Sequence, residues 1–216
     1  MSFRDKSPLY RFWPAAWLLA GLTCVLLDET LQPALRAAGK NETVDFVAHL
    51  WNELGATWGI AFFLIAGAVA SWRDRGVTVK RFASGLALAG LAVQIVKHLV
   101  GRARPSSLDG MTQFYGPLAW LRVGGEIRID SMPSGHTAAA FSMATILSLR
   151  WPRFTPLWFL IAIGVALCRT LTNSHFPSDV IVGACLGTLV SLWAYNRILP
   201  SRWSATRFQL SAGQDL

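Results

Sequence analysis

The sequence is poor in charged residues and in cysteine, and these two shortages exclude several classes of protein. Charged residues make up 15% of the 216-residue chain, whereas soluble domains average about 25%. The three cysteines, Cys24, Cys168 and Cys185, all lie in or beside apolar runs, which argues against a disulfide framework and favours small buried packing residues. The sequence has no C-x-x-C or H-E-x-x-H spacing, so it supports no metal site, and no cofactor is expected.

Long apolar stretches are what the sequence has instead. Hydrophobic residues make up 53% of the chain and include ten tryptophans. Because a helix needs roughly 20 mostly apolar residues to cross a bilayer, we predict an all-α, polytopic membrane protein with residues 1–216 in one membrane-embedded domain. The six predicted transmembrane helices are approximately Phe12–Leu31, Leu54–Trp72, Phe82–Val100, His136–Arg150, Leu157–Leu171 and Val180–Ile198.

The flanks of these stretches predict how the chain sits in a cell inner membrane. Basic residues precede the first stretch and no A-x-A cleavage site follows it, which favours a retained helix over a signal peptide. The excess of lysine and arginine in alternate loops places both termini in the cytoplasm. Residues Asn41–Gly55 show helical apolar spacing, which predicts an amphipathic helix in the outer interface. A loose polar tail is expected from about residue 204.

The net charge of +8 has two available causes, which are basic cytoplasmic loops and cations gathered for an anionic ligand. Nucleic acid is a weaker candidate partner, because the basic residues are spread between apolar runs and form no dense patch. An anion site is therefore to be expected among the polar clusters at the helix ends.

The first polar cluster ends the third predicted helix. Lys97 lies within the apolar run, and Arg104-Pro105 follows seven residues later. A lysine at membrane depth is costly and usually serves a partner or a site, although snorkelling to the interface is an alternative explanation. We expect the Arg-Pro pair to break the helix and to place Arg104 at its mouth.

The second polar cluster opens the fourth predicted helix. Ser134 supplies a hydroxyl and Gly135 allows a close backbone approach at a helix N-terminus, and such a terminus is a ready anion site. His136 follows in the first turn, within reach of a bound anion. The alternative is an ordinary helix cap with an uninvolved histidine.

The third polar cluster lies between the fifth and sixth predicted helices and contains Arg169, His175 and Asp179. Arginine offers a planar fork of donors for phosphate or carboxylate, and a neutral histidine can act as a nucleophile. An aspartate beside it can fix its tautomer. The alternative is a helix-end arginine, a loop histidine and a cap aspartate with no shared task. The predicted topology places all three clusters on one membrane face, whichever absolute orientation is right.

The three clusters together are similar to the signature motifs of the type 2 phosphatidic-acid phosphatase superfamily. Lys97-x6-Arg104-Pro105, Pro133–His136 and Arg169-x5-His175-x3-Asp179 match these motifs in order, spacing and placement, and the helical layout extends the resemblance over nearly the whole chain. The third motif of the family usually begins Ser-Arg, whereas Cys168 precedes Arg169 here. A thiol still donates weakly, so a modest effect is expected.

The resemblance implies a metal-independent phosphatase that acts on a lipid phosphate at the outer face of the membrane. It implies that His175 attacks phosphorus to form a phosphohistidine, that Asp179 bonds the other ring nitrogen, and that His136 protonates the leaving oxygen and then activates water. The residues that it implies as ligands of the phosphoryl oxygens are Lys97, Arg104, Ser134, Gly135 and Arg169.

Four substrates are expected candidates: undecaprenyl diphosphate, phosphatidylglycerol phosphate, phosphatidic acid and a lipid A phosphate. The sequence is also compatible with two other functions. The same site would serve a lipid phosphotransferase, and buried charges also line the paths of transporters. The aromatic-containing segment from Ser106 to Asp130 either contacts the lipid or is a plain connector.

Overall fold

The computed structural model describes residues 9–55, 57–70, 75–109 and 111–198. Across these ranges the chain forms α-helices and no strand, apart from one isolated β-bridge between Arg102 and Phe114. The all-α prediction is therefore confirmed. The α-helices are α1 Leu9–Gly39, α2 Glu42–Gly55, α3 Thr57–Ala70, α4 Arg75–Val100, α5 Gly135–Arg150, α6 Thr155–Leu171 and α7 Pro177–Ile198.

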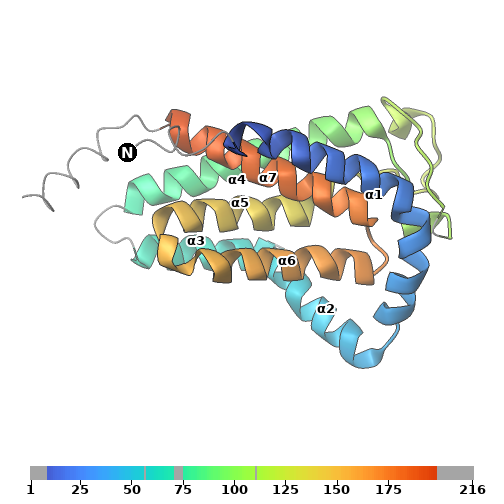
Figure 1. Cartoon of the computed structure of the whole chain (residues 1–216), viewed down its shortest axis with the longest axis horizontal. Helices are drawn as coiled ribbons and strands as arrows, with labels where there is room; N and C mark the ends of the chain where they lie inside the picture. Colours follow the sequence, from blue (N-terminus) through green and yellow to red (C-terminus); the bar gives the residue numbers. More distant parts are fainter. Residues whose placement is uncertain (1–8, 56, 71–74, 110, 199–216) are drawn as a thin grey trace, which may run out of the picture.

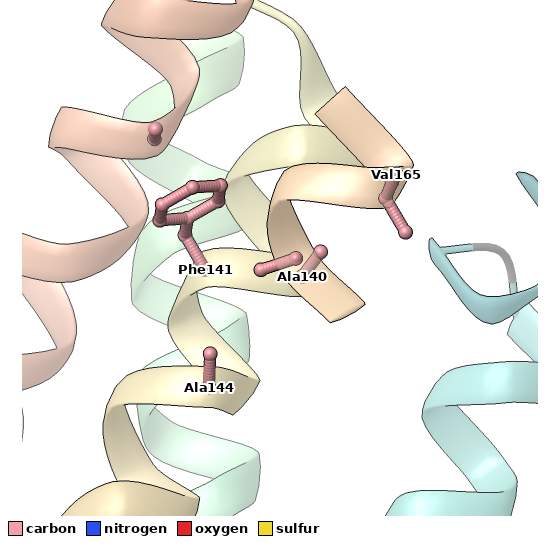
Figure 2. Close-up of a cluster of buried hydrophobic side chains, with 6 residues drawn as sticks. Ala140, Phe141, Ala144 and Val165 are labelled. Atoms are coloured by element: carbon pink, nitrogen blue, oxygen red, sulfur yellow. The ribbon is translucent and has the colours of Figure 1, made fainter. Parts of the chain in front are cut away.

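The helices form a bundle around α5 (Figure 1), and α5 contacts α4, α6 and α7. Nearly all of α5 from Thr137 to Leu147 is buried. Ala140 and Phe141 of this helix pack against Val165 of α6 and Ala184 of α7 (Figure 2). Because alanine side chains are small, they let helix backbones approach closely, as is common between helices in membranes.

Each of the six predicted transmembrane stretches overlaps a helix, but the helices differ in length. In the described part of the chain, three helical stretches are long and apolar enough to cross a membrane: Val79–Val100, Pro152–Leu171 and Pro177–Tyr195. The described helices α3 and α5 have 14 and 16 residues, fewer than the roughly 20 that a full span needs. The six-span topology therefore stays a prediction, and the tail expected from residue 204 lies outside the described residues.

Large apolar side chains are exposed along the outside of the bundle. They include Leu26 of α1, Ile65 of α3, Leu91 of α4, Leu160 and Leu167 of α6 and Trp193 of α7. Exposed apolar surface on this scale marks contact with a membrane or a partner, and it agrees with a protein that is embedded in lipid.

The helix predicted between the first two stretches is present as α2, and it packs against α6. Its Ala48 is buried, and the ring of Trp51 lies so close to Gly164 of α6 that a Cβ there would be 2.5 Å from it. Phe46 and Leu50 are exposed on α2. One face of α2 thus covers α6, and its placement in the membrane interface stays a prediction.

Helix α4 ends at Val100, before the Arg-Pro pair that was expected to break it. Gly101 adopts a positive φ of 54°, and its N–H donates to the carbonyl of Lys97 at 2.9 Å. This left-handed residue is a common helix C-cap, and glycine adopts it without steric cost. A Cβ on Gly101 would also lie 2.4 Å from the carbonyl oxygen of Gly116. The helix is therefore terminated by Gly101, and Arg104 lies in the loop that follows.

The connection between α4 and α5 and the connection between α6 and α7 lie at the same end of the bundle (Figure 1). All three polar clusters of the sequence lie in or beside these two connections. The fold thus gathers residues that are far apart in the chain at one end of α5.

Candidate active site

The first cluster forms a group of cations around one carboxylate. The Nε and Nη2 atoms of Arg104 each donate to a carboxylate oxygen of Asp130 at 2.7 Å. The Nζ of Lys97 donates to the backbone carbonyl of Asp130 and lies 3.8 Å from its carboxylate. The more exposed Arg128 also lies 3.8 Å from that carboxylate. Lys97 and Arg104 are therefore held close together, with Asp130 between them.

Asp130 was not predicted as part of the site. Burial alone would raise its pKa, but the hydrogen-bonded guanidinium of Arg104 and the charges of Arg104, Lys97 and Arg128 lower that pKa to about 2. Its carboxylate is therefore ionised at neutral pH. The only sequence signal is its place three residues before Pro133, where the second motif begins.

The second cluster is attached to the start of α7. The backbone N–H of Ser134 donates to the carbonyl of Asp179 at 3.0 Å, and the Ser134 hydroxyl accepts from Thr137 at 3.0 Å. Ser134 is fully buried and Gly135 begins α5. A Cβ at Gly183 of α7 would lie 2.6 Å from the carbonyl oxygen of Ser134, so this turn and α7 require a glycine there to approach each other.

His175 is buried beside the second cluster, with 1% of its surface exposed. Its Nδ1 lies 2.7 Å from the backbone carbonyl oxygen of Ser131. A carbonyl oxygen can only accept, so Nδ1 carries the proton and Nε2 of the neutral ring keeps a free lone pair. Burial lowers the pKa of His175 to about 4 and outweighs the opposing effect of Asp179, and the positive charges of Arg104 and Arg169 lower that pKa further. At neutral pH the ring is therefore uncharged and oriented, which is the state in which a histidine can act as a nucleophile.

Asp179 does not make the short hydrogen bond to His175 that was expected. Its Oδ2 lies 3.8 Å from Nδ1 of His175. That oxygen instead accepts from the Ser131 hydroxyl and, at 2.8 Å, from the N–H of Phe176. The carbonyl of Ser131 lies next to the imidazole, so Asp179 is linked to His175 mainly through Ser131 and the N–H of Phe176.

A buried arginine joins Asp179 to the first helix. Arg102 is fully buried, and its guanidinium lies 2.7 Å from Oδ1 of Asp179 and 2.7 Å from Oδ2 of Asp28. It also donates to the Ser178 hydroxyl at 2.6 Å, and the N–H of Ser178 donates to Asp28 at 3.0 Å. Neither Asp28 nor Arg102 was predicted for the site. The signal for Asp28 was present, because an acid inside a predicted membrane helix is costly and needs a partner.

Arg169 stands in the last turn of α6, next to the buried Cys168. Its Nη1 donates to the side-chain oxygen of Asn52 in α2 at 2.6 Å. Its buried Nε has no hydrogen-bond partner among the described residues. A buried donor without a partner carries a free-energy penalty that a bound anion would remove.

His136 is half-buried at the start of α5. The charges of Arg169, Arg104 and Lys97 and the ring of His175 all act on its imidazole. The structure therefore brings every sequence-predicted site residue to one end of the bundle. It departs from the prediction in the direct contact between Asp179 and His175.

The residues that the structure describes include no group of three or more His, Cys, Asp or Glu side chains that would hold a metal ion. The positive charge at the site comes from the lysine and the arginines. Such cations are suited to bind phosphoryl oxygens and to stabilise the charge that develops on them during transfer.

A family model described as the PAP2 superfamily matches residues 78–203, which is more than half of the chain. The chain belongs to the PAP2 superfamily, the type 2 phosphatidic-acid phosphatase family that its three motifs resemble.

Curated relatives share part of the chain. The lipid A 1-phosphatase of Rhizobium johnstonii is 31% identical over 104 residues, which are 48% of this chain and 41% of that protein. The lipid A 1-phosphatase of Porphyromonas gingivalis is 32% identical over 179 residues, which are 81% of this chain and 35% of that protein. The chain thus spans less than half the length of these two relatives.

Solved structures show the same fold. The crystal structure of Aquifex aeolicus LpxE superposes with a TM-score of 0.59 at 23% identity, covering 78% of this chain and 94% of that one. A transmembrane phosphatidylglycerolphosphate phosphatase from Bacillus subtilis superposes with a TM-score of 0.56 at 20% identity, covering 85% and 94%. The helical arrangement is therefore shared with a transmembrane phosphatase of known structure.

Proposed function

We propose that this chain is an integral membrane phosphatase that removes a phosphate monoester or a diphosphate group from a lipid through a phosphohistidine. The observation that carries the proposal is the state of His175. It is buried and uncharged at neutral pH, its Nδ1 proton is directed to the Ser131 carbonyl, and its Nε2 is free to attack. The arginines that lower its pKa are suited to hold the phosphoryl group that it attacks.

In the first step the phosphoryl oxygens bind the cations and the N-terminus of α5. Lys97, Arg104 and Arg169 supply positive charge, and Ser134 and Gly135 supply donors at the helix start. Nε2 of the nucleophilic histidine forms a bond to phosphorus while the bond from phosphorus to the lipid oxygen breaks. His136 gives a proton to the leaving oxygen, so the lipid departs as an alcohol or, from a diphosphate, as a monophosphate.

In the second step water attacks the phosphohistidine. His136, now neutral, takes a proton from the water as the P–N bond breaks. Inorganic phosphate leaves and His175 returns to its neutral form. Three cations stabilise the charge on the transferring group, so this reaction requires no metal ion.

A membrane lipid is the proposed class of substrate, and both the surface and the relatives support it. Exposed apolar side chains surround the bundle, and Trp120 and Leu121 are exposed on the connection between α4 and α5, where they would contact a lipid at the interface. The relatives include lipid A 1-phosphatases and diacylglycerol pyrophosphate phosphatases. We further propose six membrane spans, cytoplasmic termini and a site at the outer face of a cell inner membrane.

The test is phosphate release by the purified protein in detergent from lipid A, phosphatidylglycerol phosphate, phosphatidic acid and undecaprenyl diphosphate. We expect release from at least one lipid, persistence of that release with a chelator, and its loss in His175→Asn. His49→Asn, which changes an exposed histidine of α2, is the matched control. Absence of release from all four lipids would defeat the proposal, and labelled phosphate on a second lipid would indicate transfer instead of hydrolysis.

A further inference from the structure

The phosphate-binding cations already hold an anion of the protein itself. Both carboxylate oxygens of Asp130 accept from Arg104 at 2.7 Å, and Lys97 lies 3.8 Å from the same carboxylate. Arginine binds carboxylate and phosphate with the same two-pronged geometry. The carboxylate of Asp130 thus uses the donors that the proposed function assigns to the substrate.

The three side chains differ in how firmly they are enclosed. The side chains of Arg104 and Lys97 are 10% and 12% exposed, whereas that of Asp130 is 45% exposed. The cations are therefore held by the surrounding protein, and the carboxylate is the member that solvent reaches. A rotation of this one short, partly exposed side chain would free the guanidinium of Arg104 and take the carboxylate away from Lys97, whose Nζ would keep its bond to the backbone carbonyl of Asp130.

We propose that Asp130 is a displaceable counter-ion of the phosphate pocket, which pairs with Arg104 and Lys97 between turnovers and leaves when a phosphoryl group binds. This inference rests on the proposed function and adds a residue that sets the affinity of the same site. The carboxylate stays ionised throughout the neutral range, because the neighbouring cations lower its pKa to about 2.

The exchange of the Asp130 carboxylate for a phosphoryl group affects both the binding of substrate and the release of phosphate. Without an anion, Lys97, Arg104 and Arg128 would repel one another in a partly buried site, so Asp130 stabilises the empty pocket. A phosphoryl group must displace that contact, which weakens its apparent binding. When inorganic phosphate leaves, the returning carboxylate restores the neutralised pocket and limits inhibition by product.

The test measures thermal unfolding and binding of inorganic phosphate by the purified, detergent-solubilised protein. We expect Asp130→Asn to lower the melting temperature without phosphate, because the empty pocket loses its counter-ion. We also expect the dissociation constant for phosphate to fall about tenfold, the change that one charge-assisted hydrogen bond supplies. The rise in melting temperature on adding phosphate should then be larger than in the wild type.

Two further variants serve as controls. Asp130→Glu keeps a carboxylate and should stay near the wild-type dissociation constant. Glu126→Gln removes an exposed charge from the same segment and should change the constant less than twofold, as is usual for exposed charges.

A purely structural role for Asp130 predicts the opposite result. If the residue only positions Arg104, Asp130→Asn would bind phosphate more weakly than the wild type, and either weaker or unchanged binding overturns the inference. A wild-type protein that binds phosphate but releases none from any lipid would refute the proposed function alone, because the exchange is measured with phosphate and without turnover.

Discussion

The Nη2 atom of Arg102 lies 2.7 Å from Oδ2 of Asp28, and both side chains are completely buried. The pair joins the loop after α4 to α1, and the same guanidinium holds Asp179 at the start of α7. Breaking a buried ion pair from one side leaves an uncompensated charge. The stability of the fold and the geometry of the site therefore both depend on this ion pair.

We expect Asp28→Asn to destabilise the fold by about 3 kcal/mol, because the variant leaves part of a buried guanidinium without its counter-ion. The measurement is chemical or thermal unfolding in detergent. Glu29→Gln is the matched control, since Glu29 is the next residue of α1, is exposed and accepts from a loop N–H. This variant should cost less than about 1 kcal/mol. Equal losses of unfolding free energy in the two variants would contradict a stabilising role of the ion pair between Asp28 and Arg102.

Asp179→Asn is expected to reduce kcat less than His175→Asn. The tautomer of His175 is held by the Ser131 carbonyl at 2.7 Å, whereas Asp179 lies 3.8 Å from the ring. Removal of the nucleophile should abolish phosphate release, and the aspartate variant should keep a residual rate. Steady-state release and trapping of a labelled phosphoenzyme measure both effects. An aspartate variant with no detectable phosphoenzyme, in a protein that still folds, would contradict the geometry.

The pH dependence of stability follows from the pKa of His175, which is about 4 in the folded protein against an ordinary value of 6.5. Between these values the unfolded chain binds more protons, so stability rises with pH. The contribution is complete above pH 6.5 and is lost as the pH falls towards 4, and it amounts to about 3 kcal/mol. His175→Asn should flatten the stability profile in that window. A profile parallel to the wild type would show that His175 is not the group responsible.

Asn52→Ala is expected to raise KM about tenfold with little change in kcat. The amide oxygen of Asn52 accepts from Arg169 at 2.6 Å. Its removal lets the guanidinium that the proposed function assigns to phosphate binding move, and no reacting atom is changed. Hydrogen bonds to charged groups contribute about 1.5–3 kcal/mol. A loss of binding energy that affects the bound substrate and the transition state equally raises KM and leaves kcat unchanged. Asn41→Ala, which removes the side chain that accepts from the first N–H groups of α2, is the control for a general loosening of that helix. A fall in kcat at constant KM would assign Asn52 a role in the chemical step instead.

The parts of the site that sequence predicts are those encoded locally. Arg169, His175 and Asp179 lie within eleven residues of one another, and α4 and α6 follow from apolar runs that a bilayer requires. The sequence also predicts that the three motifs lie at one end of the bundle. Successive spans run in opposite directions, so these three helix ends lie on the same side.

The missed residues depend on packing between distant segments. Asp28 and Arg102 are 74 residues apart, and Asn52 and Arg169 are 117 residues apart. Spacing along the chain carries no information about such pairs, and only the docking of α1 and α2 on the rest of the bundle brings them together. The end of α4 is a different case, because Gly101 after a long apolar run is a recognisable helix stop that the more prominent Arg-Pro pair concealed.

The contact between Asp28 and Arg102 sets a practical limit on where this domain may be cut. The match to the family model begins at position 78, yet α1 neutralises the guanidinium of Arg102, which lies inside the matched region. A shortened protein, or a chimera in which the first helix is exchanged, would lose Asp28. The buried guanidinium of Arg102 would then lack one of its two carboxylate partners. Swapping experiments among relatives therefore need to move Asp28 and Arg102 as a unit.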